Sequence, residues 1–169
     1  MAIRKIVEIG DDKLRKVCKP VEKFDKRLKA LLDDMADTMY KAEGVGLAGP
    51  QVGILRRVAV IDVGDGLFKM VNPVIVEKEG EQTGLEGCLS VPGRRGEVTR
   101  PNIVTVQYQD ENGEPVTLRA HEFFARAVCH ELDHLDGVLY VDKMNREISD
   151  EEYQQMIEED EEYDEEDDQ

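Results

Sequence analysis

His130, Glu131 and His134 form the pattern H-E-x-x-H, whose side chains are those that a metal-dependent hydrolytic reaction uses. On a helix, residues four apart lie on one face, so both imidazoles can reach the same ion. The glutamate beside them can act as a base toward water. Phe123 and Ala127 continue the histidine face backwards at helical spacing. The histidines therefore extend the apolar face of an amphipathic helix, and we expect the site to lie in the core.

A hydrolytic metal site needs a third protein ligand and an open position for water. The extended motif with a third histidine fails, because Tyr140 stands six residues after His134. The glutamates after residue 150 lie in a stretch so acidic that any of them would match by chance. Cys88 lies in a glycine-bearing loop, which suits a thiolate delivered to a helix. We therefore expect Cys88 to be the third ligand.

The other two cysteines are expected to be structural. Cys129 precedes His130 by one residue, so it points about 100° away around the helix. Cys18 lies in a segment without glycine or an acid-base partner. Three cysteines at irregular spacing also argue against a disulfide framework. The first ten residues contain no long apolar run, so we expect a cytoplasmic protein without a membrane partner.

The formal charge of -16 lies mainly at one end of the 169-residue chain. Residues 147–169 contain 14 Asp or Glu and no Lys or Arg, whereas residues 1–146 carry 24 acids and 22 bases. We expect one catalytic domain over 1–146 and an acidic segment over 147–169 that is part helix and part disordered. A nearly neutral body with an acidic tail argues against direct binding to nucleic acid.

Hydrophobic periodicity and turn residues divide the chain into elements. Apolar residues recur every three or four positions after Asp25, which predicts a helix capped by Asp25 and ended by Gly44. In order, the predicted elements are an arm or short strand at 3–9, a helical turn at 14–17, a helix at 25–43, a glycine-rich loop at 44–53, strands at 57–62 and 69–77 with an edge or bulge at Pro73, an irregular loop at 84–93, strands at 97–100, 103–108 and 115–119, a helix at 120–137, and a helix at 148–157 followed by disorder. Asn112-Gly113 predicts a hairpin between the strands at 103–108 and 115–119.

Three segments together resemble the motifs of the peptide deformylase family. The matching residues, in order, are Gly44, Val45, Gly46, Leu47, Ala48, Gly49, Pro50 and Gln51, then Glu86, Gly87, Cys88, Leu89 and Ser90, then His130, Glu131, Leu132, Asp133 and His134. The resemblance implies an α+β fold in which antiparallel β-sheets pack around a central metal-binding H-E-x-x-H helix, with an N-terminal helix and a C-terminal helix. It also implies hydrolysis of the N-formyl group from the N-formylmethionyl end of newly made polypeptides, with release of formate.

The resemblance implies a role for each matching residue. Cys88, His130 and His134 would hold one divalent metal ion, and Glu131 would be the catalytic base. The Gln51 side-chain amide and the Leu89 backbone N–H would stabilise the oxyanion. Without the resemblance, Gln51 would be interpreted as a polar residue that caps a turn.

Further residues are candidates for substrate binding. Val45, Gly46 and Leu85 are expected to line the pocket for the substrate side chain, with Gly46 offering backbone hydrogen bonds to the peptide. For Val45 and Leu85 the alternative is ordinary packing. Arg95 is expected to hold the Glu86 carboxylate or substrate carbonyl groups, with a solvated surface arginine as the equal alternative. Asp133 would either support a metal ligand or face solvent.

The metal and the partners follow from the same resemblance. One thiolate and two imidazoles accept Fe(II), Zn(II), Ni(II) or Co(II), and the family resemblance indicates Fe(II). The expected partners are N-formylmethionyl nascent peptides. Some bacterial relatives end in a basic helix that docks on the ribosome, whereas this chain ends in acids, so ribosome association by that route is not favoured. Two alternative functions are a metallopeptidase that cuts internal peptide bonds and a non-catalytic protein in which the metal ion only stabilises the fold.

Overall fold

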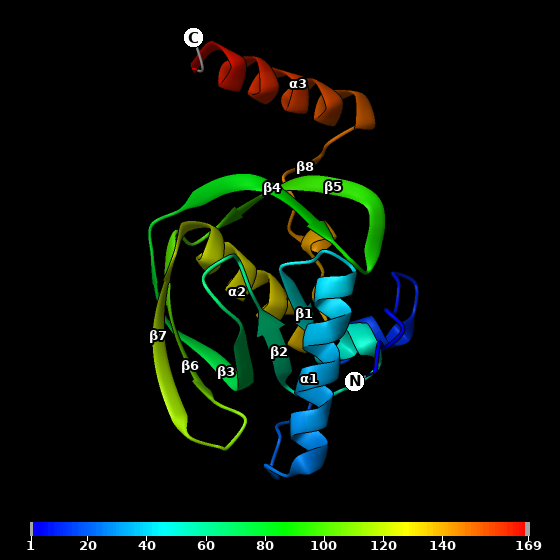
Figure 1. The fold of residues 1–169 in the computed structure, drawn as a ribbon, viewed down its shortest axis with the longest axis vertical. Helices are drawn as coiled ribbons and strands as arrows, with labels where there is room; N and C mark the ends of the chain where they lie inside the picture. Colours follow the sequence, from blue (N-terminus) through cyan, green and yellow to red (C-terminus); the bar gives the residue numbers. More distant parts are fainter. Residues whose placement is uncertain (1, 168–169) are drawn as a thin grey trace.

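The computed structural model describes residues 2–167, and their strands form two antiparallel sheets arranged around the central helix α2 (Figure 1). A five-stranded sheet has the order β1-β2-β3-β6-β7, and a three-stranded sheet has the order β4-β5-β8. This is the α+β architecture that the family resemblance implied. The elements are η1 (Asp12–Arg15), α1 (Lys26–Lys41), β1 (Gly46–Ala48), η2 (Gly49–Val52), β2 (Val58–Ile61), β3 (Phe68–Glu79), β4 (Gln82–Cys88), β5 (Val91–Arg100), β6 (Ile103–Gln109), β7 (Pro115–His121), α2 (Glu122–Leu135), η3 (Tyr140–Asp142), β8 (Arg146–Glu147) and α3 (Asp150–Asp167). No helix within residues 2–167 is both long and apolar enough to cross a membrane.

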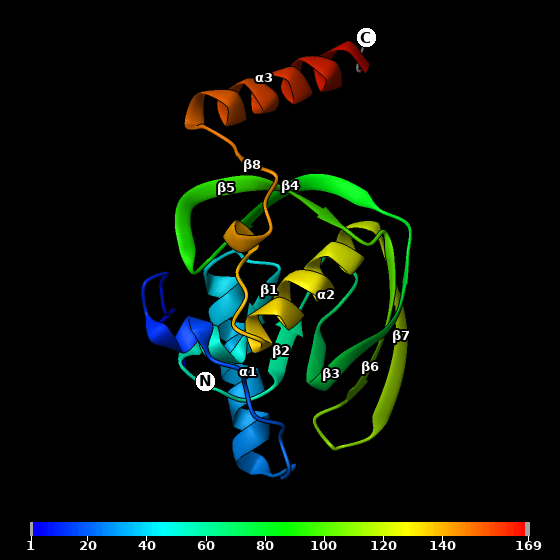
Figure 2. The ribbon, with the colours of Figure 1, turned by 180° about the vertical axis from the view of Figure 1, so that it is seen from behind.

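Helix α2, which carries the H-E-x-x-H residues, lies at the centre of the body (Figure 2). Its apolar side chains pack on the inner face of the five-stranded sheet in one core cluster. Ala125, Val128 and Leu132 supply this contact from the helix, and Met70 and Val106 supply it from the sheet. The burial of these side chains holds the histidine-bearing helix at a fixed height over the sheet.

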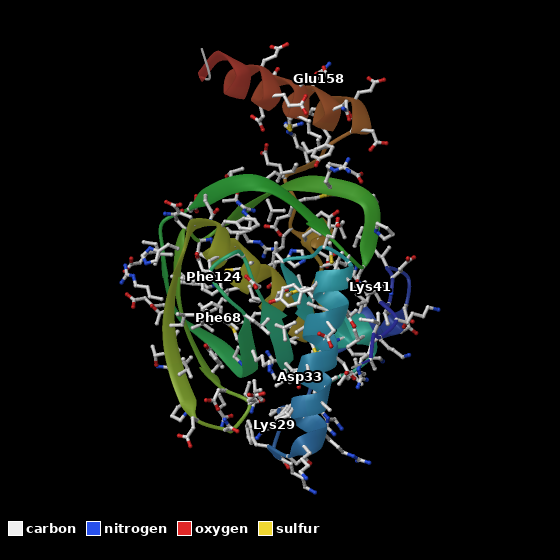
Figure 3. All side chains as sticks on the ribbon, in the orientation of Figure 1. Lys29, Asp33, Lys41, Phe68, Phe124 and Glu158 are labelled. Atoms are coloured by element: carbon white, nitrogen blue, oxygen red, sulfur yellow. The ribbon has the colours of Figure 1, made fainter. Side chains whose placement is uncertain are left out.

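Helix α1 forms as its sequence predicts and covers β1 and β2. The Asp25 side chain accepts a hydrogen bond from the Leu28 backbone N–H at 3.0 Å, which satisfies one of the free donors of the first turn. Exposed polar side chains such as Lys29 and Asp33 line the outer face (Figure 3). Asp33 pairs with Lys69 at 2.8 Å and so links α1 to β3. After the helix, the residue in the left-handed conformation is Glu43, with φ +58°, rather than the predicted Gly44.

The prediction of an irregular loop over 84–93 was wrong. These residues belong to the β4–β5 hairpin, in which Gly84 pairs with Val98 and Cys88 pairs with Val91. Glycine here does not mark a turn. A Cβ on Gly84 would lie 3.1 Å from Nη2 of Arg126, so the missing side chain makes room for a guanidinium. Sequence patterns cannot distinguish a glycine that turns the chain from one that allows close packing.

The glycine-rich stretch at 44–53 likewise contains regular structure, since β1 and η2 lie within it. Its predicted close approach to another segment is found, because one edge of β1 pairs with β2 and one face of β1 packs against α2. Pro73 lies at a register shift between Val71 and Val74, as expected for proline in a strand. The Asn112-Gly113 hairpin joins β6 and β7 as predicted.

Helix α3 leaves the body at the end distant from α1 (Figure 1). It runs to Asp167, ten residues beyond the predicted helix end at Ile157. Glutamate is a good helix former, and acids in the first turn interact favourably with the helix dipole. The helix contacts the body near its start, where Asp150 pairs with Arg95 and Glu152 pairs with Arg146.

The second half of α3 is expected to contribute little to stability. No hydrogen bond or ion pair joins the described side chains of residues 158–162 to the body, and Glu158 lies well away from it (Figure 3). Deletion of residues 158–169 should therefore leave the melting temperature nearly unchanged. Thermal unfolding of the full and truncated chains measures this directly. A fall of several degrees would show that the tail packs on the body.

Candidate metal centre

Cys88, His130 and His134 meet at one point, although 42 residues of sequence separate the cysteine from the first histidine. One ligand atom from each lies within 4.8 Å of the others, and the Cys88 Sγ is 3.4 Å from the His134 Nε2. The two rings stand one helical turn apart on α2 with centroids 5.0 Å apart. Cys88 reaches them from the end of β4. The three ligands predicted from the sequence are therefore brought together.

The three donors fit a divalent transition-metal ion. His130 Nδ1 lies 2.8 Å from Oε1 of Glu86, which places the proton on Nδ1 and leaves the Nε2 lone pair for a metal. His134 is 1% exposed and its Nδ1 has no hydrogen-bond partner among the described residues. One sulfur and two imidazole nitrogens are donors that such ions accept. Three protein ligands also leave one position open for a reacting molecule.

A buried ionic network holds the His130 ring. The Glu86 carboxylate accepts hydrogen bonds from Arg100 at 3.0 and 2.9 Å and from Arg126 at 2.5 Å, in addition to His130. Arg100 also pairs with Asp133 at 2.6 Å. Burial alone would raise the pKa of Glu86, but the bonds from His130 and Arg100 lower it to about 2. Glu86 therefore stays ionised and keeps orienting the ring at all ordinary pH values.

The Glu86 carboxylate was one of the partners considered for Arg95 in the sequence analysis, and the structure gives Arg95 other partners. Arg95 pairs with Asp150 at 3.2 Å, and its guanidinium lies 3.7 Å above the centre of the Tyr153 ring. It points to the start of α3 and does not line the site cavity. Strand alternation explains the difference: Gly96 is the residue that pairs with Glu86, so the neighbouring Arg95 points to the opposite face of the hairpin.

Two arginines in this network were missed in the sequence analysis. Arg126 precedes His130 by four residues and so lies on the same face of α2, where it also donates to the Val98 carbonyl at 3.0 Å. Arg100 comes from β5 and is 3% exposed. The available signal was a charged residue within the apolar part of an amphipathic helix, which needs a buried partner.

Glu131 lies between the two histidines and is 2% exposed. Its Oε1 is 4.0 Å from His130 Nε2 and 3.9 Å from His134 Nε2. Burial raises the pKa of the Glu131 carboxyl to about 7, in spite of the lowering effect of His130. A carboxyl with a pKa near neutrality can both accept and return a proton.

Gln51 is buried beside the ligands and held at both ends of its amide. Its Oε1 accepts a hydrogen bond from the Ala48 backbone N–H at 2.9 Å, which directs the NH2 group to the other side. That group donates to Ser90 Oγ at 3.1 Å and lies 3.5 Å from Cys88 Sγ. Leu89 follows Cys88 in the hairpin turn and lines the same cavity. An amide donor fixed in this way suits a developing negative charge.

A cavity of about 380 Å³ opens over these residues. The predicted substrate residues Val45, Gly46 and Leu85 all line it. Phe123, which was expected in the buried histidine face, is 51% exposed and also lines the cavity. The strands that border the cavity, β1 and β4, are each the edge strand of their sheet. Free strand edges can pair with an extended peptide, so the cavity is suited to a peptide ligand.

The class of protein follows from this arrangement. A cysteine sulfur and two helical imidazoles beside a buried carboxylate are the groups of a metal-dependent hydrolase of the H-E-x-x-H type. The profile of the polypeptide deformylase family matches residues 3–149, so the chain belongs to this family. It is a metal-dependent hydrolase that removes the N-formyl group from nascent peptides.

Relatives and solved structures agree with this assignment. The chain is 57% identical to a peptide deformylase of Acetivibrio thermocellus over 158 residues, which cover 94% of this chain and 93% of the relative. A peptide deformylase of Caldicellulosiruptor bescii is also 57% identical, over 92% of this chain and 93% of its own. The crystal structure of peptide deformylase from Thermotoga maritima superimposes with a TM-score of 0.85 at 43% identity, over 86% of this chain and all of that one.

Gly46 is expected to be essential for the position of Glu131. A Cβ at residue 46 would lie 2.6 Å from Oε2 of Glu131, so Gly46→Ala forces the carboxylate to move. A misplacement on the order of 1 Å should lower kcat by about 100-fold. Formate release from formyl-Met-Ala-Ser measures the loss, and thermal unfolding checks that the fold is retained. Wild-type activity would show that the carboxylate does not need this position.

Proposed function

We propose that Cys88, His130 and His134 hold the metal ion, and that Glu131 is the catalytic base. The observation that carries this proposal is the convergence of the three ligand atoms beside a buried carboxylate. When bound, a divalent ion supplies Lewis acidity that lowers the pKa of water and polarises the formyl carbonyl. Glu131 accepts a proton from the attacking water and later gives it to the leaving amine nitrogen. Formate and a free amino terminus are the products.

Donors from two loops stabilise the negative charge that develops on the formyl oxygen. The Gln51 NH2 group is directed toward the ligands by the hydrogen bond from Ala48 to its other end. The Leu89 backbone N–H lies one residue beyond Cys88 and serves the same oxygen. Donors that are already oriented do not have to reorganise during the reaction, and the loss of one costs about 100-fold or more in kcat.

The substrate binds in the cavity between the two strand edges. We propose that Gly46 pairs with the peptide backbone through its amide and carbonyl groups, and that Val45 and Leu85 contact the methionine side chain. Both side chains are about two-fifths exposed in the structure, at 41% and 37%. Their burial by the methionine therefore contributes apolar contact area to binding. Arg95 is not included, because its side chain is engaged at α3.

The remaining proposals concern the surroundings of the catalytic unit. We propose that residues 1–146 form this unit and that residues 147–169 are an appended acidic segment. We propose that the enzyme works in the cytoplasm, because its substrate is the formylated end of a new polypeptide. Ribosome docking through α3 is not proposed, since an acidic helix repels the phosphates of RNA.

Replacement of Glu131 tests the assignment of the base. Glu131→Gln keeps the shape of the side chain but removes its ability to accept a proton, so kcat should fall by at least about 100-fold. Bound metal should stay at the wild-type content, because this residue is not a ligand. Glu81→Gln is the matched control, since Glu81 is exposed and does not line the cavity. Retained turnover in Glu131→Gln would refute the role of Glu131.

The native metal is proposed to be Fe(II), as the family resemblance indicates. Protein purified without oxygen should contain about one iron per chain and should release formate from formyl-Met-Ala-Ser. Zn(II) should bind to the same three residues, since ligand type alone does not select between these ions. The Zn(II)-loaded protein should have a lower turnover. Elemental analysis with activity per metal decides the question. Highest activity per ion with Zn(II) would overturn the assignment of iron.

A further inference from the structure

A second cavity lies on another face of the helix that carries the ligand histidines. It has a volume of about 310 Å³ and is bordered by β3, the end of β5 and α2. Cys129, Leu132 and Asp133 line it from α2, and their spacing places them on one face of the helix. This face is turned away from the one that borders the catalytic cavity, so we call the second cavity the rear cavity. Its volume lies at the lower end of the range for small-molecule sites.

Buried apolar side chains form part of the rear cavity. Cys129 is 6% exposed and Leu132 is 7% exposed, and Pro73 of β3 is also buried. Small-molecule sites combine an apolar lining with a few polar groups that fix the orientation of the ligand. The apolar part of the rear cavity therefore suits a compact apolar group.

The charges around the rear cavity are unequal, because four cationic side chains and two anionic ones line it. Both anionic side chains already have cationic partners. Asp133 pairs with Arg100 at 2.6 Å and with Lys143 at 3.2 Å, and Asp136 pairs with Arg57 at 3.0 Å. The fourth cation, Lys78, is left over.

Lys78 gives the rear cavity an unpaired positive charge. Its side chain is exposed and makes no hydrogen bond or ion pair within residues 2–167. It belongs to β3, the strand that also supplies Pro73. One unpaired ammonium group beside buried apolar side chains matches a ligand that has one negative charge and a compact apolar group. A carboxylate has this single charge, whereas a phosphate monoester carries nearly two at neutral pH.

Arg100 connects the rear cavity to the candidate metal centre. It donates hydrogen bonds to Glu86 at 3.0 and 2.9 Å and to Asp133 at 2.6 Å. Lys143 shares the Asp133 carboxylate. An anion that attracts Lys143 leaves Asp133 to Arg100 alone, so Arg100 is drawn toward Asp133 and away from Glu86. The His130 ring, which Glu86 orients, then loses part of its support.

We propose that the rear cavity binds a small carboxylate with a compact apolar group, and that its occupation lowers the activity of the metal site. The carboxylate contacts Lys78 and Lys143, and the apolar group packs on Pro73 and Leu132. Binding itself does not depend on the deformylase reaction, whereas the effect on turnover rests on the proposed function. Because the ligand and the substrate occupy different cavities, kcat falls and KM stays nearly unchanged.

Benzoate is the probe for this site, and benzamide is its neutral control of the same shape. Isothermal titration calorimetry with the metal-loaded protein should give a dissociation constant on the order of 1 mM for benzoate. Benzamide should bind about 2- to 5-fold more weakly, because it lacks the charge that Lys78 attracts. Equal affinities would refute the recognition of charge, and no binding of benzoate would refute the site.

Variants of Lys78 locate the bound benzoate. Lys78→Gln should weaken benzoate binding by about 2- to 5-fold and leave benzamide binding unchanged, and Lys78→Glu should weaken benzoate binding further. Lys29→Gln is the matched control, because Lys29 is exposed on α1 and does not line the rear cavity (Figure 3). Wild-type affinity in both Lys78 variants would show that benzoate binds elsewhere, for instance at the catalytic metal.

Steady-state kinetics test the effect on the metal site. At saturating benzoate the kcat for formate release from formyl-Met-Ala-Ser should fall by about 5-fold, which is the lower end of the usual range for coupled sites. Competitive inhibition would place benzoate in the catalytic cavity and overturn the inference. An unchanged kcat at saturation would refute the coupling through Arg100. Calorimetry requires no turnover, so a failure of the proposed deformylase function is distinguished from a failure of the rear site.

Discussion

The ionic contact of Glu86 with two arginines and His130 is the constraint on which the site depends. It joins β4, β5 and α2 at one buried carboxylate, and two of these elements, β4 and α2, carry the proposed ligands. Such a network adds little net stability, but the loss of one member leaves a buried charge unpaired, which costs about 3 to 5 kcal/mol. The orientation of the His130 ring is therefore coupled to the docking of the hairpin on the helix.

Missing side chains are as important to this site as the charged ones. Gly46 allows the β1 backbone to lie against Glu131, and Gly84 allows the β4 backbone to lie against Arg126. Both strands thus approach α2 closely while their outer edges stay free to pair with a peptide. One arrangement of backbone places the base, supports the ligand and leaves a groove for an extended chain.

Elements whose residues interact locally could be predicted from the sequence. Helix α1 follows from its apolar spacing and its Asp25 cap, and the β6–β7 hairpin follows from Asn112-Gly113. The full extent of the β4–β5 hairpin could not be predicted, because glycines such as Gly84 and Gly96 make room for residues that are distant in the sequence, Arg126 and Met144. The helical extent of α3 was also missed, since acidic composition suggested disorder whereas glutamate readily forms helix.

The sequence by itself determined the chemical inventory of the site: two histidines and a glutamate at helical spacing, a cysteine in a glycine-bearing segment, and a family whose motifs they match. Only the tertiary structure decided which charges meet. Arg126 and Arg100 hold Glu86, whereas Arg95 is directed to α3. The physical reason is that helical spacing is a local property of the backbone. The pairing of buried charges depends on how a strand, a hairpin and a helix pack together, and residues far apart in the chain set that packing.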